Sequence, residues 1–205
     1  MNAAYHLAAI PEPYRILGLT LRPFSIGHHL LMQRFECAFV AEKETKAGAN
    51  DLILGVLICS MQYQEFLDLI ESRQLAPALA RWRKKIMPFS FLGVMPFLGR
   101  WWRRHYAFNV VEKMQLFSSY LKAGMKVPLY WEEEGCESSA AHWTQCVLNV
   151  LCGQLGYDYN HAVNMPMTQA FEDYFRYAES HKIIRLMTED EIAQTEQLKE
   201  ARCPA

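Results

Sequence analysis

The sequence lacks the motifs that bring catalytic groups or metal ligands together. It contains no Cys-x-x-Cys pair, no Gly-x-Ser-x-Gly elbow and no glycine-rich loop followed by Lys-Ser or Lys-Thr, which are common signatures of zinc, hydrolase and nucleotide sites. His142 and Cys146 share one helical face but supply only two of the ligands that a zinc ion needs. The run Glu132 to Glu134 indicates a solvated acidic turn rather than a general acid with its base. We therefore expect a non-enzymatic protein without metal or cofactor.

The sequence also lacks a hydrophobic run long enough to cross a membrane. The longest weakly charged apolar stretch, residues 86–99, has about half the length that a spanning helix needs and is broken by Pro88, Gly93 and Pro96. The N-terminus lacks the basic start and long apolar region of a secretory signal. Six cysteines lie at irregular spacing, which does not indicate a disulfide framework. We expect no transmembrane segment, and reduced thiols in a cytoplasm.

The overall composition is that of an ordinary globular protein. Of the 205 residues, 51% are apolar and 21% are charged, which is far from the composition of disordered chains. This length suits one domain with a sizeable core. No repeat of fixed period and no low-complexity tract divides the chain, so we expect a single domain over residues 1–205.

Hydrophobic periodicity predicts a mainly α fold, a single-domain helical bundle. The core helices are expected at residues 51–71, 106–123, 140–155 and 167–181, where residues 64–72 either continue the first helix or begin another. Further helices are expected at residues 25–36, 76–87, 158–164 and 189–202. A short extended N-terminal segment occupies residues 11–23, and a loop or arm rich in proline, glycine and aromatic residues occupies residues 86–105.

Local signals predict where several of these helices begin and end. Ser25 and Asp51 are expected as N-cap residues, whose side chains accept hydrogen bonds from the first helical turn. Thr188 and Glu191 have the spacing of a capping box. Gly124 is expected to end the helix at 106–123 in a left-handed conformation.

The apolar faces of two later helices predict how these helices pack. The inward face of the helix at 140–155 has the spacing of a buried helix and contains Trp143, Cys146, Val147, Val150, Leu151 and Leu155. The inward face of the helix at 167–181 contains Ala170, Phe171, Tyr174, Phe175 and Ala178. Glu172 and Arg176 are spaced to pair on the outside of the second helix, and residues 183–187 form a short extended piece.

One long window of the chain has no acidic residue. Between Glu71 and Glu112 the net charge is +8, from Arg73, Arg81, Arg83, Lys84, Lys85, Arg100, Arg103 and Arg104. Several aromatic side chains lie among these cations, namely Trp82, Trp101, Trp102 and Tyr106. This mixture is compatible with a core rimmed by cations, a protein interface, single-stranded nucleic acid binding, or contact of the arm with a membrane surface.

Three blocks of the chain together resemble a group of small, mostly helical prophage proteins that are encoded among tail genes and regarded as tail assembly chaperone-like. The blocks are LRPFSIGHHLLMQRF at 21–35, FNVVEKMQLFSSYLKAGMKVPLYW at 108–131, and WTQCVLNVLCGQLGYDYNHAVNMPMTQAFEDYFRYAESHKIIRLMTEDE at 143–191. They span most of the chain and consist of helix-packing and turn patterns. The length and the segment at 86–102 go beyond the smaller members of the group.

The resemblance implies a cytoplasmic assembly factor in a bacterial host cell. Such a factor binds the tape-measure protein before the tail tube polymerises, keeps its apolar helical segments soluble and helps to recruit tube subunits. The expected partner-binding residues are Trp82, Arg83, Phe97, Trp101, Trp102, Arg103 and Arg104, with the exposed side of residues 165–176 as a second choice. A homo-oligomer is compatible with this function. The alternative is a nucleic-acid-binding accessory protein that uses the basic window at 73–106.

Overall fold

The computed structural model describes residues 14–41, 46–86, 110–132 and 142–202. The described chain is mainly helical, as the periodicity predicts. Its elements are β1 (Arg15–Ile16), β2 (Leu19–Thr20), α2 (Ile26–Arg34), α3 (Ala49–Cys59), α4 (Tyr63–Glu71), α5 (Leu75–Ile86), α7 (Val110–Gly124), β3 (Tyr130–Glu132), α8 (Trp143–Leu148), the π-helix η1 (Asn149–Gln154), α9 (Tyr159–Asn164), α10 (Met167–Ser180), β4 (Ile184–Leu186) and α11 (Glu189–Arg202).

The extended N-terminal segment contains a tight hairpin. β1 and β2 pair in antiparallel fashion through a turn at Leu17 and Gly18, which have φ angles of 56° and 79°. Two successive positive φ angles match the right-handed twist of the flanking strands. Tyr120 of α7 donates a hydrogen bond from its hydroxyl to the carbonyl oxygen of Arg22 at 2.7 Å, so the segment that follows the hairpin is fixed to the core.

Helix α2 is a central core helix, although the sequence pattern did not place it among the core helices. It contacts α3, α4 and α9, and its buried residues are Ile26, Gly27, His28, His29, Leu31 and Met32. Ser25 is the N-cap, as predicted, and its side chain accepts from the His28 amide. Its two histidines, His28 and His29, are both buried.

The start of α3 corrects the prediction that Asp51 is its N-cap. The helix begins at Ala49 with Gly48 as the N-cap. The Asp51 carboxylate accepts from the Gly48 amide at 2.8 Å and from the Ala38 amide at 3.3 Å. A carboxylate three residues into the helix can reach back to the N-cap amide, so the same side chain stabilises the helix from inside its first turn.

The predicted helix at 51–71 is two helices, α3 and α4, which meet at 117°. Among the described residues, no single helix is long and apolar enough to span a bilayer. α3 and α4 reach the required length and apolar composition only when the two helices are counted together. α3 is buried over most of its circumference and packs against α7.

Gly124 does end α7, but the predicted left-handed conformation is wrong. Gly18 and Gly156 have positive φ angles, and Gly124 is not among the glycines that do. A Cβ atom at position 124 would lie 2.5 Å from Phe24 Cβ. The glycine therefore permits close packing of α7 against Phe24 rather than a special turn. The predicted start of this helix at 106 lies outside the described residues.

The predicted regular helix at 140–155 is also wrong beyond its first turns. α8 changes at Asn149 into the π-helix η1, in which the Leu155 amide donates to the Val150 carbonyl oxygen at 2.9 Å. The wider π turn takes up an additional residue and displaces later side chains around the axis. Val147 and Leu151 are buried as expected, whereas Leu155 is 39% exposed.

The C-terminal part follows the predictions closely. α9, α10 and α11 occupy the expected ranges, and β4 forms in the expected extended piece. Arg176 donates to Glu172 one turn away. The Thr188 amide donates to Glu191 Oε2 at 2.9 Å and the Glu191 amide to Thr188 Oγ1 at 3.4 Å, as a capping box requires.

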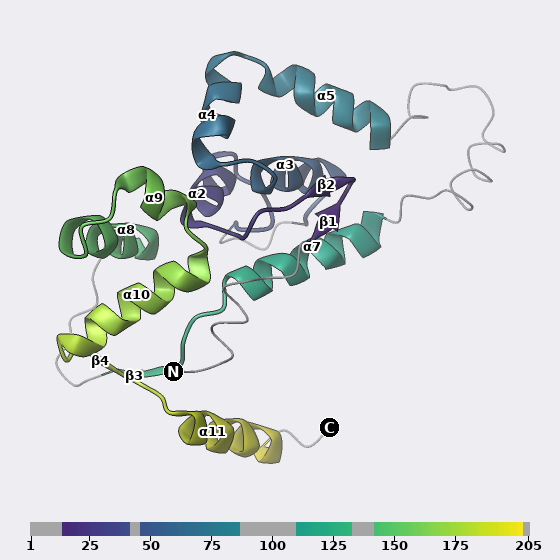
Figure 1. The fold of residues 1–205 in the computed structure, drawn as a ribbon. Coiled ribbons are helices and arrows are strands. Elements are labelled where there is room, and N and C mark those ends of the chain that lie inside the picture. Colours follow the sequence, from purple (N-terminus) through teal and green to yellow (C-terminus); the bar gives the residue numbers. More distant parts are fainter. Residues whose placement is uncertain (1–13, 42–45, 87–109, 133–141, 203–205) are drawn as a thin grey trace.

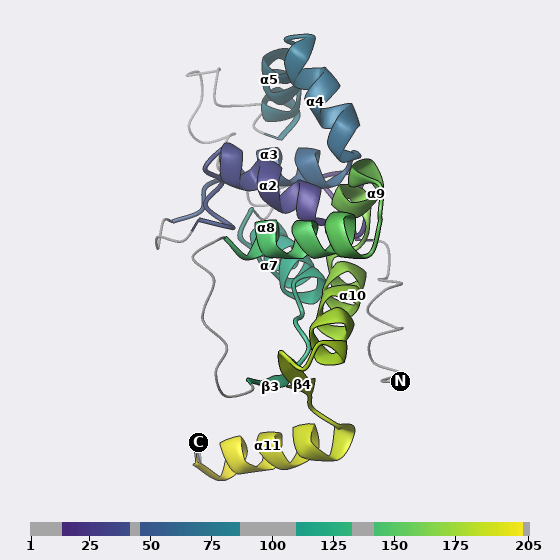
Figure 2. The same cartoon turned by 90° about the vertical axis from the view of Figure 1, so that its left-hand side faces the viewer.

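The elements form a layered helical body with one helix set apart. α4 and α5 lie at one end, α2, α3 and α7 lie in the middle, and α8, α9 and α10 cover one side (Figures 1 and 2). The β3–β4 ribbon lies at the opposite end from α5, and α11 extends beyond it away from the body (Figures 1 and 2).

Candidate functional site

An open groove lies between α2 and the segment that runs from α8 through η1 to α9. Its volume is about 940 Å³. The groove is lined by Leu30 and Gln33 from α2, and by His142, Thr144, Gln145, Leu148, Asn149, Cys152, Gly153 and Tyr159 from the other wall. The close approach of α2 and α9 depends on Gly27, because a Cβ atom there would lie 2.8 Å from the Val163 carbonyl oxygen.

His142 connects the two walls of the groove. Its Nε2 lies 3.2 Å from Gln33 Nε2 on α2, and its Nδ1 lies 2.8 Å from Thr144 Oγ1 on α8. The Thr144 amide also donates to His142 Nδ1 at 3.4 Å, so the His142 side chain caps the first turn of α8. The ring is therefore held in one orientation by a partner on each side.

A second histidine lies behind His142. His29 of α2 is 4% exposed, and neither of its ring nitrogens has a hydrogen-bond partner among the described residues. Its ring centroid lies 4.9 Å from that of Trp143 and 6.3 Å from that of His142. Burial, with repulsion from His142 as a smaller cause, lowers the pKa of His29 to about 4. His29 is thus neutral and packs as an aromatic ring.

The groove thiol is not activated. Burial, followed by the nearby charge of Asp158, raises the pKa of Cys152, so the thiol stays protonated and is a poor nucleophile near neutral pH. Cys146, which shares the predicted two-ligand pair with His142, is half-buried. In the described ranges, no group of three or more His, Cys, Asp or Glu side chains could hold a metal ion.

The groove offers hydrogen bonding without formal charge. Among the residues that the structure describes, ten line the groove, and they include no Asp, Glu, Lys or Arg; the polar ones include three amides, Gln33, Gln145 and Asn149. Apolar contact comes from Leu30 and Leu148, which form part of the walls. A pocket of this kind suits an uncharged ligand or an uncharged face of a larger one.

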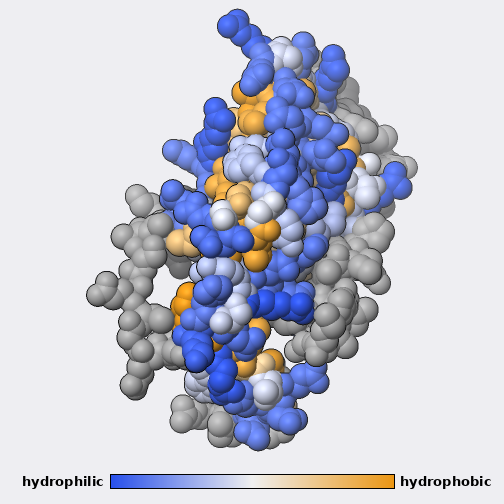
Figure 3. All heavy atoms as spheres, turned by 60° about the vertical axis from the view of Figure 1, so that its left-hand side comes forward, coloured by the Kyte–Doolittle hydropathy of each residue, from blue (hydrophilic) through white to orange (hydrophobic). Residues whose placement is uncertain are grey.

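The described residues form no single large apolar patch on the face drawn in Figure 3. Hydrophobic side chains form several small areas there, separated by hydrophilic ones (Figure 3). Large continuous apolar surfaces mark hydrophobic docking sites. On this face, recognition by a mixed polar and apolar site is better supported than recognition by an apolar groove.

Most of the predicted partner-binding residues lie outside the described residues. Phe97, Trp101, Trp102, Arg103 and Arg104 belong to this group, as does most of the arm at 86–105. Arg83 lies within α5, and Trp82 is half-buried and packs against the core cluster. Within the second predicted surface, Met165, Met167 and Phe171 are buried in the core.

The site was missed because its residues come from separate segments that carry no motif. The sequence signals near the site were the histidines at 28, 29 and 142. Only the fold shows that the rings of His29 and His142 stack. No protein-family model matches the chain, and no curated protein or solved structure matches it either.

Proposed function

We propose that the protein is a non-enzymatic assembly factor that holds a segment of a partner protein in the groove between α2 and the α8–η1–α9 segment. The observation that carries this proposal is the lining by described residues, in which amide side chains from two walls face an open volume of about 940 Å³ and no described Asp, Glu, Lys or Arg takes part. Amides can satisfy the polar groups of a bound segment, and the leucines can cover its apolar side chains.

The state of the titratable groups supports binding rather than catalysis. His142 is engaged by Gln33 and Thr144, and the pKa of Cys152 is raised rather than lowered. A nucleophile needs a depressed pKa or an adjacent general base that is free to take its proton. The described part of the groove therefore contains no activated nucleophile.

The partner we favour is a helical segment of a phage tape-measure protein, bound before the tail tube polymerises. This assignment rests on the resemblance of the three sequence blocks to tail assembly chaperone-like proteins. The first block, residues 21–35, supplies Leu30 and Gln33. The third block, residues 143–191, supplies seven of the eight described residues on the facing wall, all except His142. The groove is thus formed almost entirely by segments that carry the resemblance.

Co-expression with a long coiled-coil tape-measure protein tests this function. We expect the wild-type chain to raise the soluble yield of that protein and to co-purify with it. Gln145→Glu places a charge in the neutral groove and should abolish co-purification, because an uncharged face would leave the carboxylate desolvated. An unchanged soluble yield with the wild-type chain would contradict the proposal.

Gln115→Glu is the matched control. Gln115 is an exposed glutamine on α7, does not line the groove and lies outside both predicted partner surfaces, so the same change in charge should leave co-purification intact. Equal loss with both variants would indicate a general effect of charge. Single-stranded DNA binding that falls steeply with salt, and is equal in wild type and Gln145→Glu, would instead favour the nucleic-acid alternative.

A further inference from the structure

Both long walls of the groove are faces of helices. The lining residues that recur at i, i+3, i+4 and i+7 along α8 and η1 are Gln145, Leu148, Asn149 and Cys152. On α2, the lining residues Leu30 and Gln33 are three positions apart. Residues with these spacings lie on one side of a helix, and the stretch 145–152 covers about two turns. Each wall is therefore one face of a helix.

The groove runs along these two helices from α9 to the contact between Gln33 and His142. In Figure 2, α2 lies above α8, both helices run across the view, and α9 lies at one end of both. α9 contacts α2, α8 and η1, and Gly27 near the start of α2 allows the close approach. At the other end, Gln33 near the end of α2 meets His142, the N-cap of α8. A rod-shaped occupant that lies along both walls therefore matches the shape of the groove.

The backbone of the α8–η1 wall is already hydrogen-bonded along its middle. The described residues 145–149 lie within α8 and the start of η1, where backbone N–H and C=O groups bond within the helix. An extended segment would bring N–H and C=O groups of its own that need partners once water is excluded. A helical segment brings these groups already bonded to one another. The middle of the groove therefore favours a helix over an extended chain.

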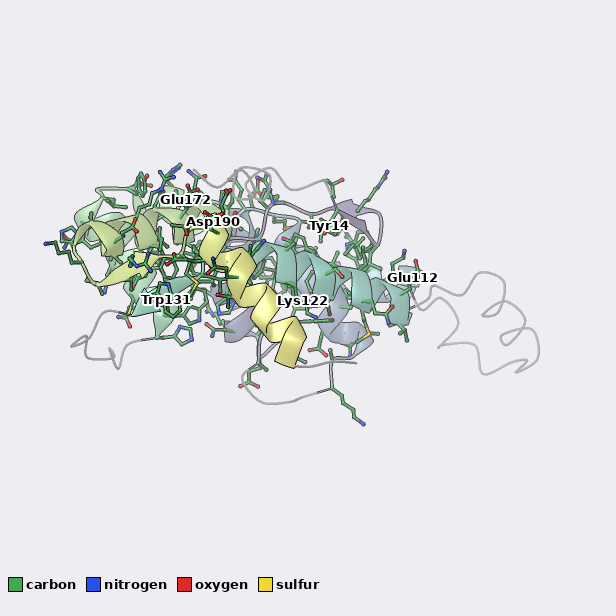
Figure 4. The ribbon with its side chains drawn as sticks, turned by 90° about the horizontal axis from the view of Figure 1, so that it is seen from below. Tyr14, Glu112, Lys122, Trp131, Glu172 and Asp190 are labelled. Carbon is green, nitrogen blue, oxygen red and sulfur yellow. The ribbon has the colours of Figure 1, made fainter. Side chains whose placement is uncertain are left out.

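Two amide side chains stand next to each other on the α8–η1 wall. Gln145 and Asn149 are one turn apart, both are exposed, and neither makes a side-chain hydrogen bond in the part of the chain that the structure describes. Each amide offers two N–H donors and one carbonyl oxygen as acceptor. Leu30 and Leu148 add apolar contact, whereas the charged side chains labelled in Figure 4, such as Lys122 of α7, lie outside the described lining. The matching face of a partner is therefore uncharged and mixes apolar side chains with amides.

We propose that the groove binds its partner segment as an α-helix that lies along α2 and α8, with an uncharged face of about two turns in contact. On that face, Leu or Ala packs against Leu30 and Leu148, and a central Gln or Asn exchanges hydrogen bonds with Gln145 and Asn149. A charged residue at the central position would lose its water between the described walls. This inference rests on the proposed function and specifies the conformation and the side-chain chemistry of the partner.

Labelled peptides test the bound conformation and the central residue. The probe is a synthetic peptide of about 18 residues, long enough to form a helix alone, with Leu at i and i+7, Gln at i+4, and Lys, Glu and Ala elsewhere. Fluorescence anisotropy with the full chain should show saturable binding. Replacing the Gln by Glu, or placing Pro in the middle of the opposite face of the peptide, should weaken binding by at least about 10-fold.

Gly153→Leu tests where the helix lies. Gly153 lines the groove, and a Cβ atom there would meet nothing within 4 Å, so the fold has room for a larger side chain that fills part of the groove. The variant should keep the wild-type circular dichroism spectrum and lose peptide binding. Gln154→Leu is the matched control, because it adds the same side chain at the next, exposed position outside the described lining. It should bind the peptide as wild type does.

The outcomes separate this inference from the proposed function. Equal binding of the Gln and Glu peptides, equal binding of the helical and Pro-containing peptides, or unchanged binding by Gly153→Leu would overturn the inference. Absence of peptide binding would overturn it as well, while capture of the tape-measure protein that Gln145→Glu abolishes would leave the proposed function standing. Peptide binding as expected, without capture of the tape-measure protein, would instead remove the tape-measure assignment and support the helical mode.

Discussion

His28 and His29 are adjacent in the sequence and serve different purposes in the fold. His28 Nδ1 accepts from the Ser25 amide at 3.2 Å, and its Nε2 lies 2.8 Å from the Met61 carbonyl oxygen. This arrangement requires a neutral ring with its proton on Nε2. His29 instead packs among Phe24, Trp143 and His142. Both rings are therefore useful to the fold only when they are uncharged.

The two histidines predict a loss of stability in mild acid. Burial lowers the pKa of each from 6.5 to about 4. A group whose pKa is lower in the folded state stabilises the fold fully above its unfolded pKa, and this contribution is lost as the pH falls from about 6.5 toward about 4. For His28 alone the loss is on the order of 3 kcal/mol. Urea unfolding at a series of pH values measures it.

His29→Phe isolates the contribution of the second histidine. Phenylalanine keeps the aromatic packing and cannot be protonated, so the variant should lose less stability than wild type between about pH 6.5 and about pH 4. Because His28 and the carboxylates titrate in both proteins, the difference between the two curves reports His29. Parallel curves would show that His29 is not held neutral by the fold.

Two glycines should respond in opposite ways to the same added methyl group. A Cβ atom at Gly55 would lie 2.7 Å from Phe117 Cε1, whereas a Cβ atom at Gly153 would have no neighbour within 4 Å. Gly55→Ala should destabilise the protein by about 1–3 kcal/mol, as overpacking in a core does. Gly153→Ala should be neutral or stabilising by up to about 1 kcal/mol, because alanine favours helix. Denaturant unfolding compares the pair.

At the scale of elements, helix α11 depends on local bonds more than on core packing. It stands away from the body (Figure 1) and begins with the Thr188–Glu191 capping box. Arg185 of β4 also donates to Glu191 Oε1 at 2.6 Å and Oε2 at 3.2 Å. These hydrogen bonds from Arg185, and then that from the Thr188 amide, lower the pKa of Glu191 to about 2. Glu191 thus stays ionised and joins the helix to the ribbon.

Thr188→Ala should destabilise α11 without unfolding the body. Loss of an N-cap side chain costs about 1 kcal/mol, and here the effect falls on a helix set apart from the core. Hydrogen exchange should accelerate in α11 while the amides of α2 and α3 keep their protection. Equal acceleration in all three helices would show that α11 is part of the global folding unit.

Sequence patterns located these elements better than they described their ends. Strong periodicity correctly predicted α10, and cap chemistry correctly predicted Ser25 and, through the pair at 188 and 191, the start of α11. The π-helix was not predictable in this way, because the apolar spacing through Leu151 fits an ordinary helix and only packing reveals the additional residue. Gly124 ends its helix for a reason that lies in Phe24, a hundred residues away.

At the scale of the whole molecule, Phe24 connects distant parts of the chain. Its ring lies 6.0 Å from that of Tyr120 on α7, and its carbonyl oxygen accepts from the Met167 amide of α10 at 2.7 Å. It also fills the space beside Gly124. Phe24 therefore joins the N-terminal segment to α7 through its ring and to α10 through its backbone carbonyl group.

Phe24→Ala should weaken the entire fold. Truncation of a buried phenylalanine costs about 3–5 kcal/mol, and here the cavity would open where the ring packs against His29 of α2 and Tyr120 of α7. The midpoint of urea unfolding should fall, and exchange protection should drop together in α2, α7 and α10. A loss confined to the N-terminal hairpin would contradict this role.

The sequence alone determined the helical class, because the spacing of apolar side chains along each segment is a local property that burial must satisfy. It also determined several helix ends, because an N-cap side chain acts within its own first turn. The tertiary structure decided which helices are central, where a helix widens into a π turn, and that Gln33 and His142, more than a hundred residues apart, meet across one groove. Those features depend on contacts between distant segments, which no local pattern contains.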